Sequence, residues 1–284
     1  MKPAQFDYHA PRTIEEAVAL LAELAPADGR VLAGGQSLVP MMAFRMAKPG
    51  HLIDINNVAG LDRLGVEGKE LVVGALVRHA DFEKPAEPGP TGRLLAKIMR
   101  SIAHGPIRAR GTFCGSLAHA DPASEWCMAA VLLGAEIVAR SKKGARRIKA
   151  AAFFQGVMST ALEADELLEQ VRIPLLPADT RVGFNEFSRR AGDFAMGMAA
   201  VAYRLEGGKV AEPRIAIGGI EPQPRRLREA EAALAGAVPG PDAFRKTAEA
   251  AATASDPMED IQTSADYRRD LVLATVTRAL EQAA

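Results

Sequence analysis

Two glycine-bearing segments carry the residues best suited to hold a ligand. The first is Ala33-Gly34-Gly35-Gln36-Ser37, directly after an apolar pair, and the second runs from Gly111 to Pro122 with the sequence GTFCGSLAHADP. Each segment offers small residues, backbone N–H groups and a hydroxyl. Such loops let main-chain amides approach a diphosphate and neutralise its charge. Two of them in one domain predict a dinucleotide held from both sides.

The first segment has two interpretations. The Gly34-Gly35 pair could be a tight strand-to-helix turn that needs a positive φ and binds nothing. Ser37 at the start of a helix favours the functional interpretation, because amides and a hydroxyl there suit a phosphate. The spacing is not the GxGxxG of a Rossmann fold, and the GK[ST] ending of a P-loop is missing.

The second segment also leaves alternatives open. Asp121 before Pro122 is typical of a helix start capped by Asp121, and the same N-terminus favours an anion. His119 and Asp121 could form an acid–base pair. We favour a hydrogen-bonded loop histidine, because no third partner of a catalytic triad is evident. Cys114 could be a nucleophile, but we interpret it as a small, semi-buried packing residue.

Composition excludes several classes of protein. The chain has 284 residues, 48% of them apolar and 25% charged, and its net charge is zero, which argues against nucleic-acid binding. No apolar run approaches the ~20 residues that span a bilayer, and the N-terminus has no secretory pattern. We therefore expect a cytoplasmic protein. The two cysteines and five scattered histidines cannot form a disulfide framework, an iron–sulfur site or a clustered metal site.

The elements that must position these segments follow from hydrophobic periodicity and turn residues. A capping box at Thr13–Glu16 starts a helix, and two short strands around a helix capped by Ser37 make a βαβ-like unit. Helices are expected over 93–103 and 122–133, and strands over 70–74, 135–140 and 167–173, with a helix start at His79. After Pro174 and Pro177, a strand meander (184–190, 196–205, 214–217) precedes helices over 227–234, 243–254 and 267–282, which predicts an α+β module.

The two segments, in this order, resemble the flavin loops of the FAD-binding medium subunit of molybdenum-containing hydroxylases. This family includes the medium subunit of aerobic carbon monoxide dehydrogenase and the FAD subunit of xanthine dehydrogenases. The likeness rests on AGGQSLVP at 33–40 and RGTFCGSLAHADPASE at 110–125, with support from FDY at 6–8 and SADYRR at 264–269. It runs nearly the whole chain.

The resemblance implies an α+β fold of the vanillyl-alcohol oxidase type, with two FAD-binding subdomains (1–57 and 58–176) and a C-terminal sheet-and-helix domain (177–284). It implies that the diphosphate is held by backbone N–H groups, and that other residues lie along the ribityl chain and the flavin. The implied diphosphate set is Ala33, Gly34, Gly35, Gln36, Ser37, Leu38, Thr112, Cys114, Gly115 and Ser116. The remaining implied cofactor-binding residues are Ile107, Ala118, His119, Asp121, Glu125, Leu168 and Phe194.

Two positions depart from the family pattern. The family commonly has paired glycines where this chain has Cys114-Gly115, so the Cys114 side chain must point away from FAD and avoid positive φ. In the carbon monoxide enzymes a tyrosine screens the flavin where this chain has Phe194, which can shield the ring without a hydroxyl. Arg189–Phe194 could equally be a solvated hairpin turn or a partner interface.

The function expected from the resemblance is electron transfer. The chain would pass electrons through FAD from 2Fe–2S clusters on a small partner subunit to an external acceptor. A large partner subunit would hold the molybdenum cofactor and oxidise the substrate, in a heterotrimer that is itself doubled. One alternative is a self-sufficient flavin oxidase or reductase of the same fold, which the lack of a clear acid–base pair disfavours. The other is a flavin-free assembly protein in which both segments are only turns.

Overall fold

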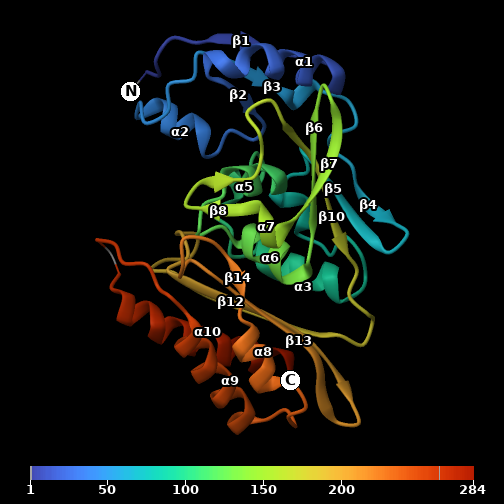
Figure 1. Cartoon of the computed structure of the whole chain (residues 1–284), viewed down its shortest axis with the longest axis vertical. Helices are drawn as coiled ribbons and strands as arrows, with labels where there is room; N and C mark the ends of the chain where they lie inside the picture. The colour runs from blue at the N-terminus through green and yellow to red at the C-terminus, as the bar shows by residue number, and fades with distance from the viewer. Residues whose placement is uncertain (1, 262) are drawn as a thin grey trace.

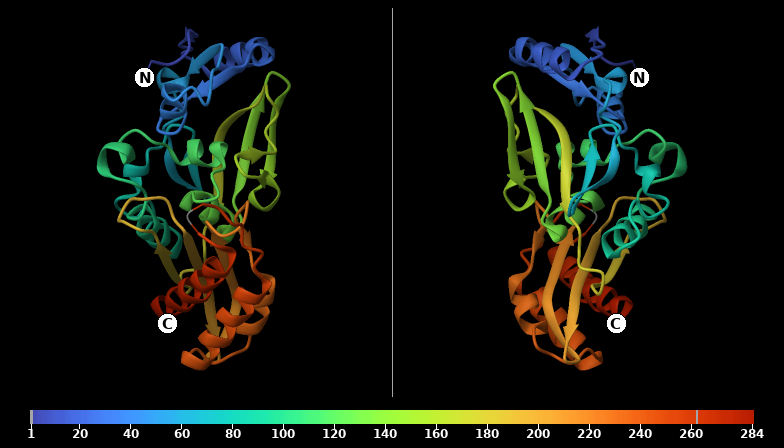
Figure 2. Two further views of the ribbon diagram at one scale, coloured as in Figure 1. Left: turned by 90° about the vertical axis from the view of Figure 1, so that its left-hand side faces the viewer. Right: turned by 90° about the vertical axis from the view of Figure 1, so that its right-hand side faces the viewer.

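The computed structural model describes residues 2–261 and 263–284, which form three larger sheets stacked along the long axis of the molecule and one two-stranded sheet (Figure 1). The N-terminal sheet lies at one end, and the C-terminal sheet with its helices lies at the other (Figure 2). The strands of the three larger sheets fall within the three predicted domains, 1–57, 58–176 and 177–284. The domain boundaries themselves stay a prediction.

The first sheet is parallel, with the order β1 (Asp7–His9), β3 (His51–Asp54), β2 (Gly29–Leu32). Helix α2 (Leu38–Ala43) connects β2 to β3, as the βαβ-like pattern predicted. Helix α1 (Ile14–Leu24) begins where the capping box placed it: Thr13 Oγ1 accepts a 3.1 Å hydrogen bond from the Glu16 N–H. The reciprocal bond to the Glu16 carboxylate comes from the Arg12 N–H rather than from Thr13.

The second sheet is antiparallel, with the strand order β4-β5-β10-β6-β7. Its strands are β4 (Leu64–Glu67), β5 (Glu70–Gly74), β6 (Glu136–Ser141), β7 (Gly144–Lys149) and β10 (Leu167–Pro174). Five helices lie in this part of the chain: α3 (Pro90–Met99), α4 (Gly105–Arg108), α5 (Phe113–His119), α6 (Glu125–Leu133) and α7 (Ala150–Phe153). It also contains a short hairpin of β8 (Phe154–Gly156) and β9 (Ser159–Thr160). Three single 3-10 turns complete this part and the connections around it: η1 (Ala25–Ala27), η2 (Ile55–Asn57) and η3 (His79–Phe82).

The third sheet is antiparallel, with the order β11 (Arg181–Phe187), β12 (Gly197–Glu206), β13 (Lys209–Gly218), β14 (Arg225–Arg226). Helices α8 (Arg228–Leu234), α9 (Pro241–Ala254) and α10 (Ala265–Ala283) pack on one face, and α6 packs on the other (Figure 1). The apolar run 198–203 of β12 is therefore buried on both faces, with alternate residues in two hydrophobic cores.

Helix α6 is the buried centre of the molecule. All of its residues are buried, although Glu125 and Trp126 are polar or large. The Trp126 ring contacts Phe82 and Phe113, with centroids 5.0 and 4.8 Å away. Such tilted aromatic contacts add stability beyond apolar burial. This cluster ties α5, which carries the second glycine-bearing segment, to α6 and to the turn at η3.

Several local predictions were wrong. The second segment is not a loop, because its residues 113–119 form α5, and the next helix begins at Glu125 instead of Pro122. Asp121 does not cap that helix; its Oδ1 accepts from the Ala123 N–H at 2.9 Å, and Ser124 is the residue at the cap. The helix expected over 93–103 begins at Pro90, as the proline rule allows, and ends at Met99. No helix of the described residues is long and apolar enough to cross a membrane.

Candidate functional site

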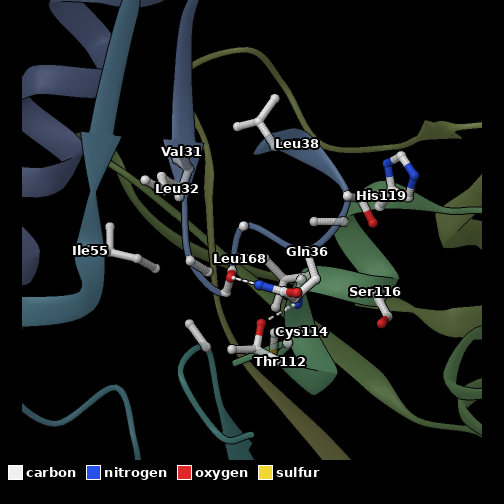
Figure 3. A pocket seen from close by; sticks show the side chains of 18 of the residues that line it. Val31, Leu32, Gln36, Leu38, Ile55, Thr112, Cys114, Ser116, His119 and Leu168 are labelled. Carbon is white, nitrogen blue, oxygen red and sulfur yellow. Dashed lines mark hydrogen bonds between the residues drawn. The ribbon is translucent and has the colours of Figure 1, made fainter. Parts of the chain in front are cut away.

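The two glycine-bearing segments face one another across a cleft of about 320 Å³ (Figure 3). The cleft lies between the first sheet and helix α5, so its walls come from two different sheets with their connecting turns. Of the residues predicted for the site, the following line it: Ala33, Gly34, Gly35, Gln36, Ser37, Leu38, Thr112, Cys114, Gly115, Ser116, Ala118, His119 and Leu168.

The first segment is a turn with unused amides. Gly35 has a φ of +72°, the left-handed conformation that favours glycine. Among the described residues, no acceptor within the protein takes a hydrogen bond from the backbone N–H groups of Gly34, Gly35, Gln36 or Ser37. Ser37 precedes α2, but its hydroxyl does not cap that helix, contrary to the prediction. The turn therefore presents free donors, the arrangement that suits an anionic ligand.

The second segment presents the first turn of α5. Thr112 Oγ1 accepts a 3.0 Å hydrogen bond from the Gly115 N–H and so caps the helix. A Cβ atom at Gly115 would lie 2.5 Å from that Oγ1, although Gly115 itself has an ordinary helical φ. Glycine is thus required at this position by close approach and not by a positive φ.

Cys114 is a packing residue in this structure. Its side chain is buried, and its Sγ lies 3.5 and 3.4 Å from the carbonyl oxygens of Val73 and Gly74. Burial raises the pKa of the Cys114 thiol, so the reactive thiolate is disfavoured. These observations agree with the packing interpretation and argue against a nucleophile.

The two segments touch one another at their glycines. A Cβ atom at Gly34 would lie 2.3 Å from the Arg110 carbonyl oxygen and 2.7 Å from the Gly111 Cα. These are closer than any real Cβ contact, so only glycine lets the two walls of the cleft approach in this way. The glycine that sequence reasoning associated with a turn is instead the contact between the walls.

A chain of hydrogen bonds, absent from the sequence prediction, holds the walls together. Asn56 Nδ2 donates to the Ala33 carbonyl oxygen at 2.7 Å, and Arg78 Nη2 donates to Asn56 Oδ1 at 2.7 Å. Arg78 Nη1 donates to the carbonyl oxygen of Arg110. Asn56 and Arg78 thereby connect the first segment to the second, and no local sequence signal marks either residue for this role.

His79, which the sequence analysis predicted only as the start of a helix, also lines the cleft. It is buried at the base of the cleft, where its Nδ1 accepts a 2.9 Å hydrogen bond from Trp126 Nε1–H. Burial, together with the nearby Arg78 and Arg108 guanidinium groups, lowers the pKa of His79 to about 4. The imidazole is therefore neutral at physiological pH.

Four predicted residues do not line this cleft. Asp121 and Phe194 line a second cavity of about 260 Å³, and the Phe194 ring is 76% exposed. Ile107 is exposed and Glu125 is buried, and neither lines either cavity. Among the described residues no hydrogen bond joins His119 to Asp121, so the structure gives no support to an acid–base pair.

Glu125 lies beside another carboxylate. Burial and the charge of Glu186 raise the pKa of Glu125 to about 8, and burial raises the pKa of Glu186 to about 7. The Oε2 atom of Glu186 is buried without a hydrogen-bond partner among the described residues. Burial and the neighbouring negative charge therefore favour a protonated Glu125 at neutral pH.

Free amides on the first wall of the cleft, and a glycine where the two walls meet, are typical of a protein that binds a dinucleotide. Residues 4–176 match the family model for the FAD binding domain in molybdopterin dehydrogenase, and residues 183–283 match the CO dehydrogenase flavoprotein C-terminal domain. The chain belongs to this family of FAD-dependent oxidoreductase subunits. The resemblance seen in the sequence, and the fold that it implied, are confirmed.

Relatives match over nearly their full length. The nicotine 6-hydroxylase medium subunit of Paenarthrobacter nicotinovorans is 37% identical, over 100% of this chain and 99% of the relative. Among solved structures, carbon monoxide dehydrogenase from Hydrogenophaga pseudoflava matches with a TM-score of 0.95 and 38% identity, over 100% of this chain and 98% of the other. Quinoline 2-oxidoreductase from Pseudomonas putida 86 matches with a TM-score of 0.93 and 36% identity, over 100% and 98% of the two chains.

The cleft fits FAD on the evidence of its own residues. Gly34 lets the two walls of the cleft approach one another, and the free N–H groups of the first segment are donors of the kind that a diphosphate requires. The described residues contain no group of three or more His, Cys, Asp or Glu side chains arranged to hold a metal ion.

Proposed function

We propose that this chain is the FAD-binding electron-transfer subunit of a molybdenum hydroxylase, and that the cleft holds the cofactor's diphosphate. The observation that carries the proposal is the pair of segments that face one another across the cleft, the first of them with unused backbone amides. Residues 33–38 would bind the diphosphate from one wall, and 112–116 from the other. Bound FAD would supply two-electron redox chemistry, and the chain's residues position it and exclude competing reactions.

The rest of the cofactor would extend along α5 toward the second cavity. Ala118 and His119 line the cleft at the end of α5, and Ala120 connects this end to the hairpin through its carbonyl oxygen, which accepts from the Met158 N–H at 3.0 Å. In this proposal Glu125 lies beside the flavin, Ile107 and Leu168 give apolar contacts, and Asp121 and Phe194 lie at the flavin edge. The position of Phe194 at the second cavity, with an exposed ring, suits a screen over the flavin.

In this proposal the electron source lies on another chain. The sequence has two cysteines, and both are buried as free thiols, so no cluster of cysteines is present to hold iron and sulfur. We propose that a small iron–sulfur subunit delivers the electrons, and that a large subunit holds the molybdenum cofactor and oxidises the substrate. The complex would be a doubled heterotrimer in the cytoplasm, with an external acceptor that reoxidises the flavin.

Purification of the complex from its native source tests this proposal. We expect the chain to elute with two other subunits, and the complex to contain flavin, iron and molybdenum. A chain that elutes alone, and that alone oxidises an organic substrate at an enzyme-like rate, would instead support a self-sufficient oxidase. An intact chain that never carries flavin would support an assembly protein.

A further inference from the structure

We propose that His79 is a diphosphate-binding residue, whose Nε2–H donates a hydrogen bond to a phosphate oxygen of the bound dinucleotide. This inference rests on the proposed FAD function and adds a side-chain donor to a site otherwise made of backbone amides. It is argued from the tautomer of the ring, its place in the cleft and the charges around it.

Trp126 fixes the tautomer of His79. The indole Nε1–H can only donate a hydrogen bond, so the His79 Nδ1 atom 2.9 Å away must be the acceptor. A neutral imidazole carries one N–H, and with Nδ1 accepting, the proton must be on Nε2. Trp126 is held in place by its contacts with Phe82 and Phe113, so this arrangement is rigid.

The Nε2–H of His79 lies at the floor of the cleft without a partner. His79 is 4% exposed and lines the cleft, and among the described residues no acceptor pairs with its Nε2 atom. A Cβ atom at Gly111 would lie 2.5 Å from Nε2, which shows that this edge of the ring lies directly under the start of the second segment. An N–H group that faces the cleft and has no acceptor within the described part of the protein is available to a ligand that supplies one.

The surroundings favour an anionic acceptor. The Arg78 and Arg108 guanidinium groups lie close enough to disfavour a charged His79, and both would stabilise negative charge near the ring. The free amides of the first segment lie on the same cleft. A phosphate oxygen supplies the acceptor that the Nε2–H of His79 and the free amides lack, and the nearby guanidinium charges favour this anion over a neutral ribityl hydroxyl.

Ligand titrations of the full-length apoprotein test the inference. His79→Gln keeps an N–H donor near the Nε2 position, and His79→Phe removes it. We expect His79→Phe to weaken FAD and ADP about tenfold, the scale of one hydrogen bond to a charged group, and His79→Gln to retain most of the affinity. Riboflavin and adenosine, which have no diphosphate, should bind the wild type and both variants alike. His51→Phe, on β3 outside the cleft, is the matched control.

An NMR measurement on the wild-type protein tests the same inference without any substitution in the site. In protein labelled with ¹⁵N-histidine, we expect a protonated Nε2 and an unprotonated Nδ1 for His79, and a shift of the Nε2–H signal on addition of ADP but not adenosine. A proton on Nδ1, or a signal that ADP leaves unmoved, overturns the inference. If wild-type protein binds FAD while both His79 variants bind it normally, the inference is wrong and the proposed function stands. If wild-type protein binds no FAD, the proposed function itself is wrong.

Discussion

Arg78 and Asn56 are joined by a 2.7 Å hydrogen bond that connects the two walls of the cofactor cleft. Asn56 follows β3 in the first sheet, and Arg78 follows β5 in the second. Asp54 extends the chain of bonds, because its Oδ1 accepts from Asn56 Nδ2 at 2.6 Å and its Oδ2 accepts from Tyr8 Oη at 2.6 Å. The spacing of the two glycine-bearing segments therefore depends on side chains that do not line the cleft.

A double-mutant cycle on this pair should show coupling. We expect Asn56→Ala and Arg78→Met each to weaken FAD binding, because each frees one wall, and the double variant to lose less than the sum. A coupling of about 1 kcal/mol or more in FAD affinity is expected for two groups in one network. Arg63→Met, which removes an exposed guanidinium just before β4, is the control. Strictly additive losses would show that the bond does not position the walls.

Gly34 should tolerate no side chain. Because a Cβ atom there meets backbone atoms of the opposite wall, Gly34→Ala should push the walls apart and reduce FAD affinity by at least tenfold, a loss of about 1.4 kcal/mol. Gly65→Ala is a matched control, since a Cβ atom at Gly65 meets nothing within 4 Å. Equal FAD affinity in the two variants, measured by flavin fluorescence, would contradict the close approach of the walls.

Gly35 and Gly115 give a paired comparison of two different constraints. Gly35→Val should weaken FAD binding because valine disfavours the left-handed φ at that position. Gly115→Val should weaken it because the side chain would displace the Thr112 hydroxyl that caps α5. We expect each variant to lose more free energy of FAD binding than free energy of unfolding of the apoprotein. Normal FAD binding by both would remove the diphosphate assignment from these segments.

The stability of the fold should fall between about pH 4.5 and pH 8 because of Glu125. Its pKa is raised in the folded state, so the folded protein binds the proton more tightly than the unfolded chain does. The associated stability is fully present below the unfolded value near 4.5 and is lost as pH rises through about 8. Glu125→Gln, which cannot ionise, should match the wild type near pH 4 and exceed its free energy of unfolding above pH 8 by a few kcal/mol, on the order of the pKa shift.

Denaturant titrations across this pH range provide the measurement. The exposed Glu23, replaced by Gln in the same way, serves as the control and should not alter the pH profile. If the free energy of unfolding of Glu125→Gln and of the wild type changed with pH in the same way, Glu125 would not be the group that carries the proton. The paired Glu186 would then be the group to replace.

Phe194 should control access to the flavin. We expect Phe194→Ala to change the rate of flavin reoxidation by an external acceptor, because the exposed ring would no longer screen the flavin, while FAD affinity stays within about twofold. Stopped-flow mixing of the reduced protein with several acceptors measures the rate. Unchanged reoxidation with every acceptor would argue that Phe194 only rims the second cavity.

Local patterns in the sequence predicted much of the fold. The capping box at Thr13 predicted the start of α1, and the prolines near residue 176 predicted the end of a strand close to where β10 ends. Both signals depend only on neighbouring residues. Helix α5 was missed because GTFCGSLAH looks like a loop, since glycine disfavours helix. The Thr112 cap and the burial of Phe113, Cys114 and Leu117 stabilise a helix here.

The site was predicted only in part for a related reason. Glycine segments are visible in sequence, and both line the cleft. The bonds of Asn56 with Arg78 and of His79 with Trp126 join residues 22 and 47 positions apart, and they exist only because strands pair and helices pack. Single-residue propensities carry no information about such contacts.

The flavin content of the purified chain tests the central claim most directly. The apoprotein should take up FAD without a covalent bond, to about one FAD per chain, and should release it on denaturation. A folded chain that stays colourless after incubation with excess FAD, with its melting temperature unchanged by the cofactor, would contradict the account.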